Sequence, residues 1–500
     1  MPDAVANFLI AWLDPWLLLL TGLGTLAGVY VGAIPGLSVT MAASILISFT
    51  FKWDVNDALA LMTGVFVGGV YGGARTAILL NIPGAPSAIA TALDGYPLAK
   101  KGLAGEAIGL TTLMSVMGGL IGIVALALFA PPLSSLALMF QSRDYLLLGL
   151  IGILLVGTLS GDFAKGAFAG ALGVLIGMVG LDPMTAEGRF TFGTITLMGG
   201  IHYVVAMIGF FGVAEALMQM RDIDLPAVRQ RVSRVVPPWA DVKRYFALAL
   251  RSSGIGAVIG ALPGTGGDIA ALLAYDQAKR STKDPQTPFG EGAKEGLVAP
   301  EAANNAAVGG AFIPMLTLGI PGDAVTAVII GALFIHGLKP GPLLLSDTPH
   351  LFWFMVGSLT LANVFLLIFG LTGIRIFAKI VECPKAVLVP LIIVLSVVGA
   401  YAIQNNPADI YWMLAFGVVG YFMKYYSYPV APVILGVILG PMMDANYRRA
   451  MIGARNDPLT FLADFITHPI SLVLSVAFLL MLISQTPLWP GRRKREAEAE

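Results

Sequence analysis

Long apolar runs without charged residues follow one another along most of the chain. The clearest of them are Phe190–Ala214, Leu351–Ile374, Ala386–Ala408 and Tyr425–Met443. Shorter runs cover 145–161 and 167–181, and another is divided at Pro131-Pro132. Because a helix needs about 20 apolar residues to cross a bilayer, the pattern predicts an all-α, polytopic transmembrane protein with about ten to twelve membrane segments, some of them broken.

Composition supports lipid as the main solvent of this chain. Of its 500 residues, 57% are hydrophobic and 12% are charged, with a mean hydropathy of +0.82. Soluble proteins carry about twice that charged fraction. The net charge is zero, and the sequence contains no basic surface of the kind that would predict a nucleic-acid partner. The single cysteine, Cys383, excludes an internal disulfide, and the four histidines show no metal-ligand spacing, so no metal or cofactor is expected.

Basic residues predict the orientation of the chain. Arg492, Arg493, Lys494 and Arg495 follow the last apolar run, which places the C-terminus in the cytoplasm by the positive-inside rule. The basic segment 221–244 is expected on the same side. Lys279, Arg280 and Lys283 follow after only one apolar stretch, interrupted at Pro263-Gly264. Either that stretch re-enters and returns, or one basic loop breaks the rule; re-entry is favoured.

Two motifs occur twice in the same order. GVYVGAIPG at 28–36 matches GAVIGALPG at 256–264, an offset of 228 residues from Pro35 to Pro263. GGARTAILLNIPG at 72–84 matches GGAFIPMLTLGIPG at 309–322, an offset of 238 from Pro83 to Pro321. Two matches in register indicate an internal duplication. Gly-x-x-x-Gly is typical of close helix packing.

The four Pro-Gly pairs predict four broken membrane helices. A break exposes backbone N–H and C=O groups that hydrocarbon cannot satisfy, so broken segments at matching places in two halves indicate a transporter's central site. Polar residues flank each break, which favours a solute site over simple proline kinks. The candidate substrate-binding residues from the breaks are Pro35, Gly36, Ser38, Thr40, Asn81, Pro83, Gly84, Ser87, Pro263, Gly264, Thr265, Gly266, Thr317, Pro321 and Gly322.

Charged and amide side chains in apolar surroundings add further candidates. Arg75 is either a carboxylate clamp, a partner of an acidic residue, or an interfacial residue. Asp268 and Asp323, which follow breaks of the second half, either sense a coupling ion, Na⁺ or H⁺, or cap the next helix. In APEAANNAAVGG, Glu301 is a third ion-coupling candidate, while Asn304 and Asn305 are expected to contact the solute or to form interhelical hydrogen bonds.

At these residues the chain resembles a known family, the large membrane subunits of the tripartite tricarboxylate transporters (TctA). The similar segments are YGGARTAILLNIPGAPSAIATALDGYPLAKKGLAGEAIG at 71–109, the stretch 263–342 that contains APEAANNAAVGG, and ILGVILGPMMDANYRRAM at 434–451. The chain departs from the family pattern at Ala74-Arg75 and at Met443-Asp444. The charge of Arg75 is compatible with an altered substrate class.

The resemblance implies a permease subunit of the bacterial inner membrane, and no enzyme. Its implied partners are a small transmembrane subunit and a periplasmic solute-binding protein that delivers an organic carboxylate, with uptake driven by an ion gradient. The resemblance implies that the substrate site contains Pro35, Gly36, Asn81, Pro83, Gly84, Pro263, Gly264, Asn304, Asn305, Pro321 and Gly322. The alternatives are a self-sufficient ion-coupled transporter, a channel, and an intramembrane aspartyl protease, for which Tyr275-Asp276 is the only matching pair.

The repeated motifs and the apolar runs predict a division of the chain into five parts. The first repeat covers 1–115 with breaks at 35–36 and 83–84, and the second covers 245–345 with breaks at 263–264 and 321–322. The remaining parts are scaffold helices and a cytoplasmic basic loop at 116–244, C-terminal transmembrane helices at 346–490, and a charged cytoplasmic tail at 491–500.

Overall fold

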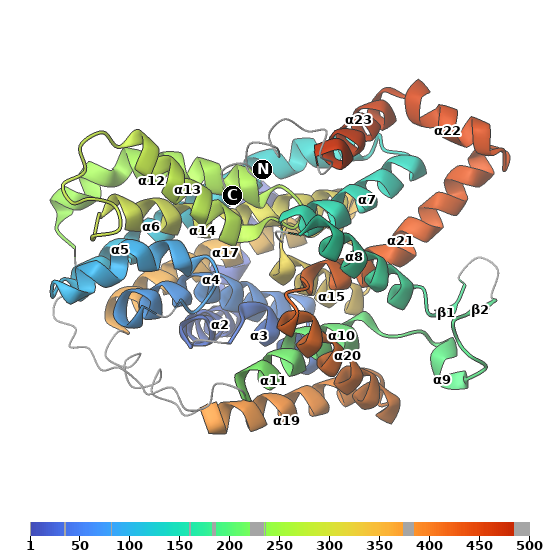
Figure 1. The fold of residues 1–500 in the computed structure, drawn as a ribbon, viewed down its shortest axis with the longest axis horizontal. Helices are drawn as coiled ribbons and strands as arrows, with labels where there is room; N and C mark the ends of the chain where they lie inside the picture. The colour runs from blue at the N-terminus through green and yellow to red at the C-terminus, as the bar shows by residue number, and fades with distance from the viewer. Residues whose placement is uncertain are drawn as a thin grey trace. The chain divides into compact units, whose positions relative to one another are not determined.

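The computed structural model describes most of the chain, and nearly all of the described regular structure is helical (Figure 1). The described residues are 2–34, 37–81, 83–159, 162–182, 187–220, 235, 237–373 and 385–484. Pro35, Gly36, Cys383 and the predicted tail at 491–500 therefore lie outside them. Within the described part, the only strands are β1 (Gly180–Leu181) and β2 (Gly188–Arg189), a two-residue antiparallel pair. The predicted all-α class is confirmed.

The chain forms two compact units, each built from two separate stretches of sequence. The first unit comprises Met1–Ser134 and Val204–Tyr421, and the second comprises Ser135–Tyr203 and Phe422–Glu500. The helices that lie wholly or mainly in the first unit are α1 (Pro2–Leu13), α2 (Pro15–Ala33), α3 (Val39–Thr50), α4 (Val55–Leu80), α5 (Ala88–Lys100), α6 (Ala104–Ala137), α10 (Tyr203–Met207), the π-helical turn η1 (Ile208–Val213), α11 (Ala214–Met220), α12 (Trp239–Gly260), α13 (Gly266–Ser281), α14 (Glu295–Leu318), α15 (Ala324–Ile335), α16 (Pro342–Asp347), α17 (Pro349–Thr372), α19 (Lys385–Gln404) and α20 (Pro407–Tyr425). The second unit holds α7 (Ser142–Leu159), α8 (Phe163–Gly177), α9 (Ile195–Met198), α21 (Ala431–Gly453), α22 (Pro458–Thr467) and α23 (Pro469–Ser484).

Within the described residues, five continuous helical segments are long and apolar enough to cross a membrane. They are Pro15–Ala33, Val55–Leu80, Ala104–Ala137, Tyr203–Met220 and Pro349–Thr372. A sixth candidate is the pair Pro458–Thr467 and Pro469–Ile483, bent by 95°. Shorter apolar helices, α3 and α15 among them, supply broken segments of the kind expected from the sequence.

Three details of the predicted runs are wrong. The run Phe190–Ala214 is not one helix, because Phe190 and Phe192 have positive φ and a continuous helical segment begins only at Tyr203. The run Tyr425–Met443 is interrupted before α21 begins at Ala431. Conversely, α6 continues through Pro131-Pro132. Proline costs a helix one hydrogen bond, and the flanking turns of this long helix outweigh that loss.

Glycines let the paired helices of each repeat approach to backbone contact. In the first repeat, an added Cβ at Gly32 of α2 would lie 2.1 Å from the Gly69 carbonyl oxygen of α4. In the second, a Cβ at Gly260 of α12 would lie 2.4 Å from the Ala307 carbonyl oxygen of α14. Gly28 and Gly256, one turn earlier, make the equivalent contacts, with Val65 and Ala303. The matching contacts support the duplication inferred from the motifs.

The two repeats are inverted relative to each other. Within each repeat the contacts advance together along both helices, so α2 runs parallel to α4 and α12 runs parallel to α14. Between the repeats, residues that come later in α4 meet residues that come earlier in α14. The neighbouring pairs are Phe66 with Phe312, Val70 with Asn304, and Ile78 with Leu297. The helices α4 and α14 are therefore antiparallel, which is the arrangement of an inverted repeat.

The first two helices of the second repeat, α12 and α13, form a hairpin whose tip is the Pro263-Gly264 break. The beginning of α3 lies at Gly69 of α4, where a Cβ would be 2.5 Å from the Val39 side chain. In the second repeat, Arg251 of α12 donates to the Ser281 hydroxyl at the end of α13 (2.8 Å), so α13 returns alongside α12. This hairpin has the geometry that a re-entrant segment requires.

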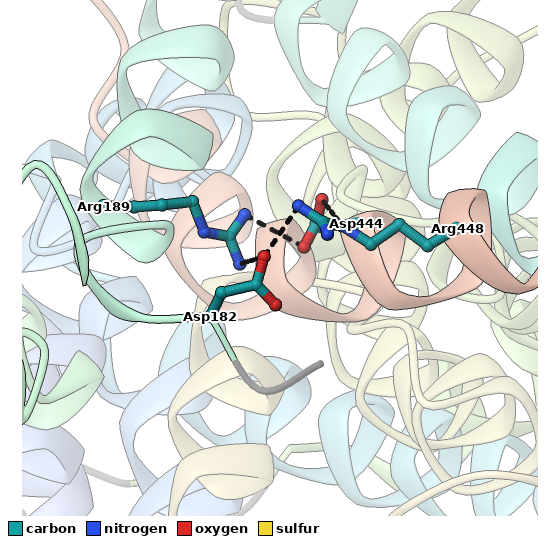
Figure 2. Close-up of polar contacts among 4 residues, drawn as sticks. All are labelled: Asp182, Arg189, Asp444 and Arg448. Carbon is teal, nitrogen blue, oxygen red and sulfur yellow. Dashed lines mark hydrogen bonds and ion pairs between the residues drawn. The ribbon is translucent and has the colours of Figure 1, made fainter. Parts of the chain in front are cut away.

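In the second unit a closed ring of ion pairs ties the β1–β2 segment to α21 (Figure 2). Arg189 contacts Asp182 (3.4 Å) and Asp444 (3.0 Å), and Arg448 contacts the same two carboxylates at 2.7 and 3.2 Å. Asp444 is thus paired with two arginines. Asp444 therefore has a structural role in this unit.

Candidate functional site

All three breaks whose helix ends and proline are described interrupt the backbone where the sequence predicts. α4 ends at Leu80 and α5 begins at Ala88, while α14 ends at Leu318 and α15 begins at Ala324. Both α4 and α14 end on a left-handed residue, Asn81 (φ 57°) and Gly319 (φ 72°), at equivalent places of the two repeats. Asn and Gly are the residues that tolerate this conformation best. Asn81 therefore ends a helix.

The second and fourth breaks fold back against their own repeats through one glycine each. A Cβ at Gly84 would lie 2.1 Å from the Gly32 carbonyl oxygen. A Cβ at Gly322 would lie 2.7 Å from the Gly260 carbonyl oxygen, which is the equivalent contact. In each repeat the second break therefore packs against the end of the helix that precedes the first break. Pro83 and Gly84 are half-buried, whereas Pro321 and Gly322 are buried.

The third and fourth breaks are in direct contact. The Gly264 N–H donates to the Pro321 carbonyl (3.3 Å). A Cβ at Gly266, which has φ of +63°, would lie 3.2 Å from the Cβ of Asp323. These bonds satisfy part of the backbone that the breaks expose, and they bring the two candidate aspartates of the second repeat to one region.

A polar cluster joins the second break to the third across the repeat interface. The Ser87 N–H, at the start of α5, donates to Asp268 Oδ1 (2.9 Å). Asn304 Nδ2 donates to the Ser87 hydroxyl (3.1 Å) and to the Val70 carbonyl (3.2 Å). Ser87 and Asn304 are buried, while Asp268 is exposed. The cluster thus presents one accessible carboxylate at the N-terminus of α5, beside a buried pair of polar side chains.

Comparison with known proteins identifies the family. A model described as the tripartite tricarboxylate transporter TctA family matches residues 18–435. The chain belongs to the TctA family. It is 36% identical over 503 residues to an uncharacterized 52.8 kDa protein in the TAR-I ttuC' 3' region of Agrobacterium vitis, with 99% of each chain covered. It is also 38% identical over 239 residues to an uncharacterized protein in the TAR-II ttuC' 3' region of the same organism, covering 48% of this chain and 97% of that one.

No solved structure matches this TctA-family chain. The match to the family model runs from α2 into the beginning of α21 and therefore spans all four Pro-Gly motifs of the sequence. The chain is therefore a component of a membrane transporter, which is what the sequence resemblance implied.

Several candidate residues of the TctA-family chain have local hydrogen bonds. Ser38 caps α3 by accepting from the Met41 N–H (3.0 Å), and Asp323 caps α15 in a capping box with Thr326. The Thr265 hydroxyl donates to the Leu262 carbonyl (3.0 Å), which closes the end of α12. The remaining candidates of this kind are Thr317, bonded to the Ile313 carbonyl (2.7 Å), and half-buried Thr40 beside the Ser38 cap. Ser38 and Asp323 are therefore helix caps in this structure, and for Asp323 this is the capping alternative raised from the sequence.

Glu301 lies in a separate buried cluster. Its two carboxylate oxygens accept from the hydroxyls of Thr91 on α5 (2.5 Å) and Ser115 on α6 (2.9 Å). Among the residues that the structure describes, no Lys or Arg pairs with it. One turn further along α14, Asn305 donates to the Glu301 carbonyl (3.1 Å), and its own Oδ1 is buried without a described partner. This cluster offers oxygen acceptors to a proton or cation.

Arg75 donates hydrogen bonds to the C-terminal end of a neighbouring helix, α17. The guanidinium is buried at 2% exposure and donates from Nη2 to the carbonyls of Phe369 (3.0 Å) and Gly370 (2.7 Å), in the last turn of α17. Its Nε donates to the Tyr71 hydroxyl (3.2 Å). A cation at a helix C-terminus satisfies free carbonyls and complements the helix dipole. The predicted carboxylate clamp stays a prediction; the described bonds show a cap for α17.

Asp94 has a larger role than its sequence context suggested. The Asp-Gly pair and the following proline of ALDGYP, residues 92–97, are typical of a turn, but α5 runs through this stretch from Ala88 to Lys100. Asp94 Oδ1 accepts from the N–H groups of Gly290, Gly292 and Ala293, at 2.8 to 2.9 Å, and Oδ2 accepts from the Tyr275 hydroxyl (2.9 Å). Burial and these long-range bonds outweigh the local turn propensity.

Proposed function

We propose that this TctA-family chain is the permease subunit of a binding-protein-dependent, ion-gradient-driven transporter that takes up organic carboxylates. The meeting of Ser87, Asp268 and Asn304 at the interface of two inverted repeats supports this proposal most strongly. Inverted repeats with discontinuous helices place solute and ion sites at the repeat interface. A small membrane subunit and a solute-binding protein are the partners that the family's tripartite description suggests.

The Asp268 carboxylate gives this proposal a coupling step. A carboxylate is favourable at the N-terminus of a helix, and in this structure Asp268 fills that place on α5 through the Ser87 N–H. A solute carboxylate would compete for the same N–H. Protonation of Asp268, or its pairing with Na⁺, would weaken its bond to Ser87 and free the helix end. Ion and solute would then bind together, which is the requirement for symport.

Reconstitution tests the function. The chain and its small membrane subunit, inserted into liposomes with an inward Na⁺ or H⁺ gradient, are expected to accumulate radiolabelled citrate or another organic carboxylate only when the loaded binding protein is added outside. Accumulation without the binding protein would instead establish a self-sufficient transporter. Flux that merely equalises the carboxylate concentration under every gradient would establish a channel and contradict the proposal.

A further inference from the structure

A cavity with no assigned role lies at the far end of the second repeat's hairpin. It has a volume of ≈ 390 Å³ and is lined by α12, by the end of α13 and by Glu295 in the first turn of α14. Its lining residues include Arg244, Arg251 and Leu248 of α12 and Ser281 of α13. It lies within the first unit and is distinct from the breaks, because Arg251 and Ser281 are at the opposite end of the hairpin from Pro263-Gly264.

Two exposed guanidinium groups border this cavity. Arg244 and Arg251 are seven residues apart in α12, which puts them on one face of the helix with about 10 Å between them along its axis. Arg251 Nη2 donates to the Ser281 hydroxyl (2.8 Å). Neither arginine forms an ion pair with another described residue. Guanidinium groups arranged in this way are suited to the oxygens of a phosphate.

The same cavity also contains a buried acceptor that needs a donor. Glu295 is 5% exposed, and its Oε2 has no described hydrogen-bond partner. The adjacent cation, Lys294, is already bonded to Glu106 and Asp241. The hydroxyl of Tyr245, which is 3% exposed, is likewise buried and without a described partner. Glu295 Oε2 can therefore accept from an N–H donor of a ligand whose anionic group lies at the two arginines.

An apolar track continues from the cavity along the same face of α12. Val258 follows Arg251 by two turns of α12, and Leu262 lies just beyond the end of the helix; they are 65% and 42% exposed. Gly254, between them and Arg251, has open space around it, with nothing within 4 Å of an added Cβ. A charged end joined to an exposed apolar track matches a molecule with a polar head and an acyl chain.

We propose that this cavity binds a phospholipid whose head group carries both a phosphate and a primary amine, a phosphoethanolamine head group. Arg244 and Arg251 hold the phosphate, and Glu295 accepts from the ammonium group. One acyl chain lies along Gly254, Val258 and Leu262. The bound head group fixes the end of α13 against α14, and the acyl chain runs from there toward the Pro263-Gly264 break.

Native mass spectrometry of the purified full-length chain tests this assignment. Phosphatidylethanolamine is expected to bind about tenfold more tightly than phosphatidylcholine with the same acyl chains, because a quaternary ammonium cannot donate a hydrogen bond to Glu295. Glu295→Gln is expected to remove that preference. The double substitution Arg244→Gln with Arg251→Gln is expected to weaken both lipids at least about tenfold, since both need the phosphate contacts.

Arg280→Gln is the matched control, because Arg280 is an exposed arginine of α13 paired with Asp276. It is expected to bind both lipids as the unsubstituted chain does. Unchanged binding by a folded double arginine variant would overturn the proposal. So would full competition by soluble glycerophosphoethanolamine, which would assign the cavity to a free phosphoester instead of a lipid. If the double variant fails to fold, Glu295→Gln decides: an unaltered preference for phosphatidylethanolamine overturns the assignment.

Discussion

At the residue scale, the polar side chains near the breaks differ in how many of their hydrogen-bonding positions are already occupied within the folded protein. Asp323 forms a capping box with Thr326, and Ser38 is the N-cap of α3. Asp268 accepts one backbone N–H from another element and remains exposed. A carboxylate with spare acceptor capacity at a helix end can exchange partners, whereas a fully engaged cap cannot without unfolding a turn.

Asp268→Asn is expected to uncouple transport from the ion gradient. The amide oxygen still accepts from Ser87, so the fold is kept, but the side chain no longer takes up a proton or attracts a cation. In the reconstituted system, gradient-driven accumulation should be lost while exchange of labelled for unlabelled carboxylate persists. Asp276→Asn, an exposed and ion-paired position on the same helix, is the control. Undiminished accumulation by Asp268→Asn would exclude Asp268 from coupling.

Arg75→Met is expected to lower the stability of the protein by about 2 kcal/mol or more, because it leaves two carbonyls of the last turn of α17 without their charged donor. Thermal unfolding of the purified variant measures this loss, and Arg75→Lys should restore part of it. If Arg75→Met unfolds like the original chain but no longer transports, the predicted carboxylate clamp is favoured over the helix-capping role.

At the element scale, each repeat contains a pair of parallel helices in backbone contact. The break that follows the second helix of the pair packs against the end of the first helix. Gly32 with Gly69, and Gly260 with Ala307, set this distance in the two repeats. In lipid, helices associate mainly by such packing, because the hydrophobic effect does not drive apolar helices together there. Side chains larger than hydrogen would force the helices apart and displace the breaks that they position.

Gly260→Ala and Gly254→Ala test this packing on the same helix. The first Cβ would lie 2.4 Å from the Ala307 carbonyl oxygen and should destabilise the protein by about 1–3 kcal/mol. The second meets nothing within 4 Å and should leave stability unchanged or raise it by up to about 1 kcal/mol. Unfolding midpoints in detergent give the comparison. Equal effects of the two substitutions would contradict the close packing of α12 on α14.

At the scale of the whole molecule, the inverted repeat has a consequence for topology. Since α4 and α14 are antiparallel neighbours, we predict that they begin on opposite sides of the membrane. The segment before α4 contains Asp54, and the segment before α14 contains Asp284. The basic residues Lys279, Arg280 and Lys283 predict, by the positive-inside rule, that the second segment is cytoplasmic.

Cysteine labelling tests this topology. In a Cys383→Ser background, Asp54→Cys should react with a membrane-impermeant maleimide in intact spheroplasts, and Asp284→Cys should react only in inside-out vesicles. Detergent-solubilised samples of both variants, in which each cysteine is accessible, provide the control for labelling efficiency. Labelling of both cysteines from the same side would contradict the inverted arrangement.

The sequence by itself determined the solvent, the duplication and the positions of the breaks, because each depends on local properties: continuous apolar length, a repeated motif, and Pro-Gly in an apolar run. It also led to the family through the stretches around Asn81 and Asn304. It did not reveal that Asn81 and Gly319 end equivalent helices, although their alignment in the two repeats carries that signal.

Tertiary structure alone decided which polar groups meet. The hydrogen bond from Ser87 to Asp268 joins residues 181 positions apart, and the bond from Arg75 to the end of α17 joins residues 295 positions apart. No local sequence pattern encodes such contacts, nor the direction of α14 relative to α4. The same holds for Asp94, where a turn-like sequence became a helix because its carboxylate satisfies three backbone N–H groups elsewhere. Apolar periodicity specifies that a segment is buried in lipid or protein, but the partner of each buried polar group is fixed only when the helices pack.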